Sequence, residues 1–382
     1  MNILEVEKKC TGCAACVDSC YLGALKLGGD ENGFYSPILD SDKCVNCEKC
    51  LKACPLINFE AVTGKKDCFY CWSVDDSARR TSSSGGVFSV FAKEILSQNG
   101  VVFGAEYSED YKSVKINSTL NTSLEALKTS KYVQSNAEGA YRSMLEELKK
   151  GRKVLFTGAP CQIAGAKNVL KSCSENLLLV DFLCGGFASP TCFSQYADWL
   201  EDKYKSKIVG MNFRDKKKGW TNSGIKVKFR NKKEYFSTSS YDPYYYYYYC
   251  TPYMKNESCM DCKFKSQRAA DITIADFWGF RNLKIPNDEK GMSLIITHTE
   301  KGRAFLDSIK ESLVLYSLEE KDISYGFVIK NRTQEELEER KNFLSEVRKK
   351  GFIEVAKKNY YKNGKTGIVF RKIKKRFKSI FK

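Results

Sequence analysis

Histidine is almost absent from this chain of 382 residues, which has one, His298. A single imidazole excludes His-rich zinc sites and Rieske centres, and it argues against Ser-His-Asp catalysis. His298 ends the apolar run 294–298, which is typical of a buried strand. We therefore expect a structural role for this residue.

Long apolar runs are missing too. No stretch approaches the roughly 18 residues that a membrane span requires. The short, acidic segment 1–7 also lacks the character of an export signal. We therefore expect a cytoplasmic protein, in which the 17 cysteines serve as thiols and cluster ligands in a reducing compartment.

Nucleotide motifs are absent as well. No Gly-x-Gly-x-x-Gly follows a predicted strand, and residues 364–366 imitate only the end of a P-loop, since Asn359 replaces the required upstream glycine. Phosphoryl transfer is therefore not expected. The chain has a formal charge of +17, but no recognition fold for nucleic acid accompanies it, so we expect no nucleic-acid partner.

Cysteine, by contrast, is abundant and regularly spaced. The pattern C-x2-C-x2-C-x3-C occurs twice before residue 60, and Tyr21 stands where a proline usually follows the first run. Bacterial two-cluster ferredoxins have this pattern, and their fourth cysteine ligates the other cluster. Zinc ribbons use cysteine pairs instead, and a disulfide framework requires secretion. The predicted ligands are Cys10, Cys13, Cys16 and Cys54 for one 4Fe-4S cluster, and Cys44, Cys47, Cys50 and Cys20 for the other.

The rest of the chain has a different pattern. Residues 1–60 form the ferredoxin-like unit, and the polar segment 61–82 is interpreted as a linker, although it contains Cys68 and Cys71, for which packing is favoured over metal binding. Beyond it, helices and strands alternate, which predicts α/β layering. The predicted strands are 101–103, 154–157, 177–183, 271–276 and 293–298, with a hairpin at 225–237; the predicted helices are 87–96, 138–150, one from 162, 190–204 and 335–360.

Four further cysteines lie at informative places. Cys161 and Cys184 follow predicted strands, and Cys259 and Cys262 form a C-x2-C pair in a loop. Strand ends converge at the carboxyl edge of such a sheet, so these thiols are able to form one ligand shell. Because buried single cysteines are common, the spacing alone leaves packing as an equal alternative.

Several segments together resemble the coenzyme F420 hydrogenase/dehydrogenase beta-subunit family, with a ferredoxin module fused ahead. They are 82–88, 130–135, 158–162, 214–216, 219–220, 259–262 and 271–279. The resemblance implies a beta-subunit N-terminal-like domain at 83–190, a C-terminal-like domain at 191–345, FAD, and a third 4Fe-4S cluster on the four cysteines just described. It departs at Gly185, where close relatives usually carry histidine. The implied FAD contacts are Ser84, Gly85, Gly86, Lys131, Tyr132, Ser135, Arg214 and Lys216.

The expected fold is thus a two-cluster ferredoxin domain joined to a mixed α/β module that binds flavin and a cluster. The expected function is an iron–sulfur flavoprotein oxidoreductase, which moves electrons between clusters and FAD to reduce or oxidise a small organic substrate. Its electron partner would be a protein such as ferredoxin, and bacterial relatives with this fusion point to surface-polysaccharide pathways. The alternative is a non-catalytic electron-transfer subunit that docks on a partner oxidoreductase.

Two segments add weaker expectations. The run Tyr244–Tyr249 favours packing, because on a helix at most two or three of its rings face one site. The basic tail 346–382 is predicted to be helical and to contact an anionic membrane at the inner face, with a disordered tail as the alternative. Its apolar face would consist of Val369, Ile373, Phe377, Ile380 and Phe381.

Overall fold

The computed structural model describes residues 3–4, 6, 10–239, 241–323 and 333–358. The apolar residues of the predicted membrane-binding tail, 369–381, lie outside these ranges. Within them, no helix combines the length and the apolar character that crossing a membrane requires.

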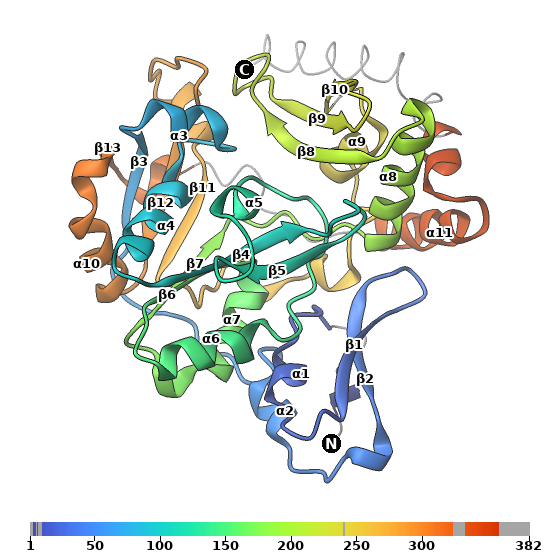
Figure 1. Cartoon of the computed structure of the whole chain (residues 1–382), viewed down its shortest axis with the longest axis horizontal. Coiled ribbons are helices and arrows are strands. Elements are labelled where there is room, and N and C mark those ends of the chain that lie inside the picture. Colours follow the sequence, from blue (N-terminus) through green and yellow to red (C-terminus); the bar gives the residue numbers. More distant parts are fainter. Residues whose placement is uncertain (1–2, 5, 7–9, 240, 324–332, 359–382) are drawn as a thin grey trace.

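The N-terminal unit repeats a simple arrangement, in which each cysteine run contains a short helix. The helices α1 (Ala15–Ser19) and α2 (Lys49–Ala53) carry the third cysteine of each run and end at the fourth, and the strands β1 (Leu25–Gly29) and β2 (Tyr35–Leu39) pair antiparallel between them. The unit projects from the rest of the molecule, and the loop between β2 and α2 lies at its far end (Figure 1).

An eight-stranded mixed sheet organises the remainder, as the alternating pattern predicts. Its order is β13-β3-β12-β11-β7-β6-β4-β5, in which β4, β6, β7 and β11 are parallel and the outer strands pair antiparallel. The bounds are β3 Asp67–Ser73, β4 Val101–Tyr107, β5 Val114–Ser118, β6 Val154–Thr157, β7 Leu177–Phe182, β11 Ile272–Asp276, β12 Ser293–Thr297 and β13 Leu313–Leu318.

The interpretation of 61–82 as a linker is wrong, because this segment contains β3 and α3 (Asp76–Thr81). The aromatic and apolar residues of β3 suit a pleated, half-buried surface, and β3 pairs with strands on both of its sides. Cys68 and Cys71 lie in different apolar clusters, so they pack separately and do not form a metal site.

Helices cover both faces of the large sheet. The helix α4 (Val87–Ser97) packs in one apolar cluster with residues of the sheet, and α6 (Ala140–Lys149) and α7 (Pro160–Val169) pack in another. The short α5 (Leu124–Leu127) contacts β4, and α10 (Glu300–Ser308) precedes β13. The strands β6 and β7 are almost entirely buried, as their continuous apolar sequence predicts.

A second layer contains a small antiparallel sheet with the order β10-β9-β8. Its aromatic core also includes the helices α8 and α9, and α11 packs against it. The predicted long helix 335–360 is interrupted at Gly351, whose φ of 84° ends α11 before residues 352–358 continue as helix. The bounds are β8 Ile208–Asp215, β9 Gly224–Phe229, β10 Glu234–Thr238, α8 Pro190–Tyr204, α9 Pro243–Cys250 and α11 Gln334–Lys350.

Candidate functional site

The two cysteine runs fold into loops of the same backbone shape. Gly12 and its counterpart Asn46 have φ values of 64° and 54°, and Ala14 and its counterpart Glu48 have 68° and 59°. Left-handed residues at matching positions curl each loop around a centre, so that its cysteines face a common space. The internal duplication seen in the sequence is therefore a duplication of structure.

Three of the four predicted ligands in the first group are buried, and Cys10 is partly exposed. Burial, with the nearby thiols of Cys10 and Cys54 adding to it, raises the pKa of Cys13 to about 12. Burial also raises the pKa of Cys16, with contributions from the same three thiols. Such thiols become stable thiolates only beside a strong positive charge, which an iron cluster supplies.

The second group lies toward the far end of the unit. Burial raises the pKa of Cys50, and the neighbouring Cys44 and Cys47 add to this shift. Cys20 and Cys50 both pack against the small core of the unit. Lys49, which precedes Cys50, places its Nζ 4.2 Å from the ring centroid of Tyr21, which follows Cys20. The end of the first run therefore lies beside the second run, as the predicted exchange of the fourth cysteine requires.

The third set of cysteines converges as well. Cys161 lies in the first turn of α7, Cys184 follows β7, and Cys259 and Cys262 flank a short turn. All four line one void of about 20 Å³, together with Thr11 of the ferredoxin unit. The backbone N–H of Gly186 donates to Cys184 Sγ at 3.3 Å, and that of Phe187 donates to Cys259 Sγ at 3.4 Å.

Within the described ranges, no three His, Cys, Asp or Glu side chains lie close enough together to hold one metal ion. The four cysteines that line the void have the donor atoms that a 4Fe-4S cluster requires. A 4Fe-4S cluster bonds each thiolate to a different iron, so its ligands lie further apart than those of one ion. Backbone N–H groups that donate to the sulfurs stabilise the thiolates and tune the reduction potential of such a centre.

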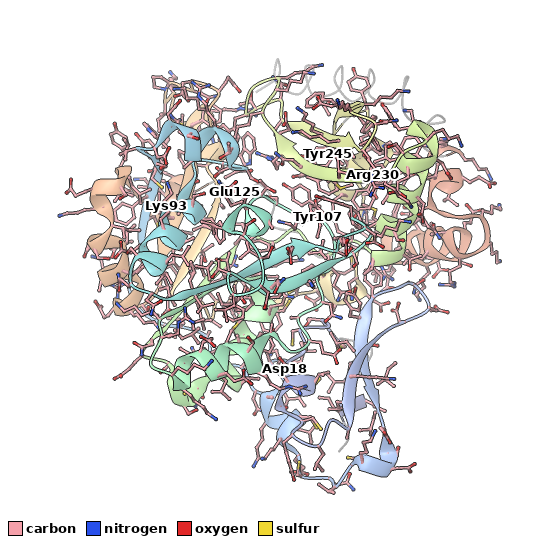
Figure 2. The ribbon with its side chains drawn as sticks, viewed as in Figure 1. Asp18, Lys93, Tyr107, Glu125, Arg230 and Tyr245 are labelled. Atoms are coloured by element: carbon pink, nitrogen blue, oxygen red, sulfur yellow. The ribbon has the colours of Figure 1, made fainter. Side chains whose placement is uncertain are left out.

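The third set adjoins the first run of the ferredoxin unit. Burial raises the pKa of Cys161, and the thiols of Cys262 and Cys13 contribute to the shift. The Tyr141 hydroxyl donates to the carbonyl of Cys13 at 2.6 Å and to that of Gln162 at 3.1 Å. Asp18 of α1 (Figure 2) accepts from the N–H of Tyr141 in α6 at 2.8 Å. The ferredoxin unit and the α/β module thus share one core.

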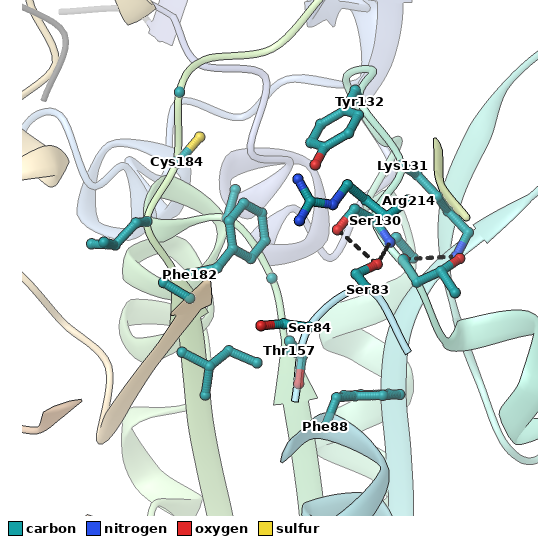
Figure 3. Close-up of a pocket in the computed structure, with 18 of the residues that line it drawn as sticks. Ser83, Ser84, Phe88, Ser130, Lys131, Tyr132, Thr157, Phe182, Cys184 and Arg214 are labelled. Atoms are coloured by element: carbon teal, nitrogen blue, oxygen red, sulfur yellow. Dashed lines mark hydrogen bonds between the residues drawn. The ribbon is translucent and has the colours of Figure 1, made fainter. Parts of the chain in front are cut away.

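A cavity of about 350 Å³ opens beyond the third set. It lies where β6, β7 and β11 end, at Thr157, Phe182 and Asp276, which is the edge where parallel sheets place their ligands. Tyr132 and Arg214 lie on one side of it, and Cys184 and Phe182 lie on the other (Figure 3). The residues Cys184, Gly186, Phe187 and Lys265 line both this cavity and the cysteine void.

The cavity is strongly cationic. Six basic side chains line it, and Asp276 is the one carboxylate among its described lining residues. Burial lowers the pKa of Lys131 to about 7, and its Nζ donates to the carbonyl of Lys128 at 2.7 Å. A polyanionic ligand would favour the charged form of this amine. The basic residues are Lys128, Lys131, Arg214, Lys255, Lys265 and Arg268.

Two buried polar groups at the cavity have unused hydrogen-bonding capacity. The Arg214 side chain is 6% exposed, and its Nη2 lies 2.9 Å from an Asp276 oxygen but without hydrogen-bond geometry. Neither Arg214 Nε nor Thr157 Oγ1 has a hydrogen-bond partner among the described residues. Unsatisfied buried groups are costly, so both atoms indicate a polar ligand in this cavity.

Comparison with known proteins agrees with this arrangement. Residues 151–323 match the family defined by the C terminus of the coenzyme F420 hydrogenase/dehydrogenase beta subunit, and residues 9–56 match a 4Fe-4S dicluster domain. The chain is thus related to the coenzyme F420 hydrogenase/dehydrogenase beta subunit over residues 151–323, and it carries a ferredoxin domain of the dicluster type near its N-terminus. It is therefore an iron–sulfur, oxidoreductase-like electron-transfer protein, as the resemblance predicts.

Two relatives illustrate the two parts. An uncharacterized ferredoxin of Methanocaldococcus jannaschii is 40% identical over 55 residues, which are 14% of this chain and 70% of that protein. A chain in the xenon-derivatised F420-reducing [NiFe] hydrogenase complex of Methanosarcina barkeri aligns with 73% of this chain and 91% of its own length. That alignment has 14% identity and a TM-score of 0.48.

Six of the eight predicted FAD contacts line the cavity, whereas Gly85 and Lys216 are not among its lining residues. The N–H of Gly85 donates to Ser293 Oγ at 2.9 Å, and a Cβ at Gly85 would lie 2.7 Å from the carbonyl oxygen of Cys71. Lys216 Nζ donates to the carbonyl of Ser84 at 2.6 Å. Both residues hold the loop that carries Ser84. The six lining residues are Ser84, Gly86, Lys131, Tyr132, Ser135 and Arg214.

Some cavity residues were not predicted from the sequence. Tyr248 and Tyr249 line the cavity, whereas the four tyrosines before them are buried in the aromatic core, as the packing interpretation expects. The ring of Tyr132 lies 4.6 Å from that of Tyr248 between centroids. Trp278 also lines the cavity, and the sequence could have indicated it, because it lies just after β11 in the segment 271–279 that carries the family resemblance. Arg268 gave no sequence signal.

Proposed function

We propose that this protein is an iron–sulfur flavoprotein oxidoreductase with three 4Fe-4S clusters and FAD in the cationic cavity. FAD, when bound, couples one-electron exchange with clusters to two-electron chemistry on a small organic substrate. The observation that carries the proposal is the set Cys184, Gly186, Phe187 and Lys265, which lines both the cysteine void and the cavity. A cluster and a flavin held there would be direct neighbours.

The lining residues suit a dinucleotide. Ser83 Oγ accepts from the N–H of Ser130 at 2.9 Å, which joins the loop before α4 to the loop that carries Lys131 (Figure 3). The N-terminus of α4 and Lys131 would favour phosphate groups, and Tyr132 offers a ring for stacking. Arg214 would direct its unsatisfied Nε toward an anionic group of the ligand.

The alternative is an electron-transfer subunit that lacks its own substrate. Phe182 favours it, because this residue is 37% exposed and lines the cavity, where it would suit contact with a partner oxidoreductase. A flavin reduced by the partner but by no small molecule would support this reading.

Anaerobic purification with iron, sulfide and flavin measured together tests the proposal. Three clusters require about twelve iron atoms per chain. We expect Cys259→Ser to reduce iron to about eight, whereas the matched control Cys173→Ser, outside all three sets, should leave it unchanged. Iron near eight in the unchanged protein, insensitive to Cys259→Ser, would remove the third cluster. Full iron content without uptake of added FAD would remove the flavin.

A further inference from the structure

The second cysteine run lies in a part of the unit that solvent can reach. Cys47 is exposed, and Cys44, Cys50 and Cys20 are partly exposed. By contrast, Cys13, Cys16 and Cys54 of the first group are buried. A cluster on the second group would therefore lie outermost in the chain, while a cluster on the first group would adjoin the third set inside the shared core.

Exposed apolar side chains directly follow two of these outer cysteines. Tyr21 is 62% exposed and follows Cys20, and Val45 is 61% exposed and follows Cys44. Leu22 adds a third exposed apolar side chain. Tyr21 and Val45 each follow a predicted ligand cysteine directly in the chain, so both residues lie close to the predicted outer cluster. We call Tyr21, Leu22 and Val45 the docking patch.

We propose that the outer cluster exchanges electrons with a small one-electron carrier protein of the ferredoxin type, which binds the docking patch. This proposal rests on the proposed function, in which electrons pass between the clusters and FAD, and it adds the site where an external carrier would bind. A 4Fe-4S cluster takes up one electron at a time, so its partner must be a one-electron carrier. Brief redox encounters use small interfaces, and exposed apolar side chains next to predicted ligand cysteines suit such contact.

The chemistry of the step is simple. The reduced carrier loses one electron and the outer cluster gains it, with no bond or proton transferred. With clusters held by all three sets of cysteines, the second group would be outermost and the first group would lie next to the third set, because Thr11 of the first run lines the void of that set. Docking at the patch brings the carrier to the end of this series where a predicted ligand, Cys47, is exposed.

The test compares Val45→Asp with Val209→Asp in full-length, cluster-loaded protein. Val209 is 47% exposed on β8, so the same charge is introduced at a comparable surface site far from the clusters. The probe is a reduced bacterial two-cluster ferredoxin; the readouts are the dissociation constant of the complex and the rate at which cluster absorbance bleaches. Dithionite, which needs no docking, provides the reference rate.

We expect Val45→Asp to weaken ferredoxin binding and slow bleaching about tenfold, because an uncompensated charge would be buried at the interface. Val209→Asp should stay near the unchanged protein, and both variants should bleach normally with dithionite. Equal rates for the two variants with ferredoxin, or no transfer from ferredoxin to the unchanged protein, would overturn the proposal. Bleaching needs neither flavin nor substrate, so this failure is distinguishable from failure of the proposed function.

Discussion

The two cysteine runs share one spacing and one loop shape, yet they lie in opposite surroundings. Every residue from 11 to 18 is buried, whereas at the equivalent positions 45–52 six of the eight are exposed and the other two are partly exposed. The first run packs against α6 and α7 of the α/β module. The spacing therefore determines what the runs bind, while packing determines which other groups can reach it.

The buried run also depends on partners far along the chain. Asp18 accepts from the N–H of Gly139 at 2.7 Å, and Gly165 of α7 leaves room for Cys13, whose Sγ would lie 3.2 Å from a Cβ at that position. The exposed run is held by local contacts, such as the ion pair of Lys43 with Asp40. Substitutions at the buried run should therefore cost more than matched ones at exposed positions.

The largest effect is expected for Asp18→Ala. The change leaves N–H groups at the start of α6 without an acceptor in a buried setting, which costs about 2–4 kcal/mol of unfolding free energy. Asp40→Ala is the matched change at the exposed run, where water replaces the lost carboxylate, so little loss is expected. Anaerobic urea denaturation measures both. Similar losses in the two variants would contradict the contrast between the runs.

Gly165→Val should have an intermediate effect. A Cβ there would lie 3.0 Å from Ala15 Cβ, so the larger side chain forces α7 away from α1 at a cost of about 1–3 kcal/mol. Gly210→Val serves as control, because the nearest atom to its added Cβ is a Lys228 side-chain carbon at 3.6 Å. The urea midpoints of the two variants test this. Unchanged stability for Gly165→Val would mean that the close approach of α1 and α7 is unimportant.

The smallest effect concerns pH and distinguishes the α/β module from the ferredoxin unit, which has no histidine. Burial, with the charge of Arg268 adding to it, lowers the pKa of His298 to about 4, and its Nε2 lies 2.7 Å from Thr273 Oγ1. The unfolded chain takes up this proton near pH 6.5 and the folded chain only near pH 4. Stability therefore falls as pH drops through this window, by about 1–2 kcal/mol at pH 5.

His298→Gln removes this titration, so its stability should change less between pH 7.5 and pH 5 than that of the unchanged protein. Denaturation midpoints are measured for both proteins at the two pH values. The quantity compared is the change in midpoint between pH 7.5 and pH 5, and not the midpoint at either pH. An equal change in midpoint for the two proteins would show that His298 has the same pKa in the folded and the unfolded chain.

Local sequence determined much of this protein. The paired cysteine runs predicted the dicluster domain, which comparison confirms, and the apolar periodicity predicted β6 and α8 with the bounds that the structure shows. Both signals depend on residues close together in the chain, where spacing and backbone geometry act directly. The matched segments likewise predicted the family.

Tertiary structure decided the rest. It made the segment 61–82 part of the large sheet, left Gly85 and Lys216 out of the cavity lining, and brought Tyr248, Arg268 and Trp278 to that lining. It also buried one cysteine run and exposed its duplicate. These outcomes depend on packing between residues more than a hundred positions apart, and no local pattern of spacing or propensity reports which distant surface will cover a given side chain.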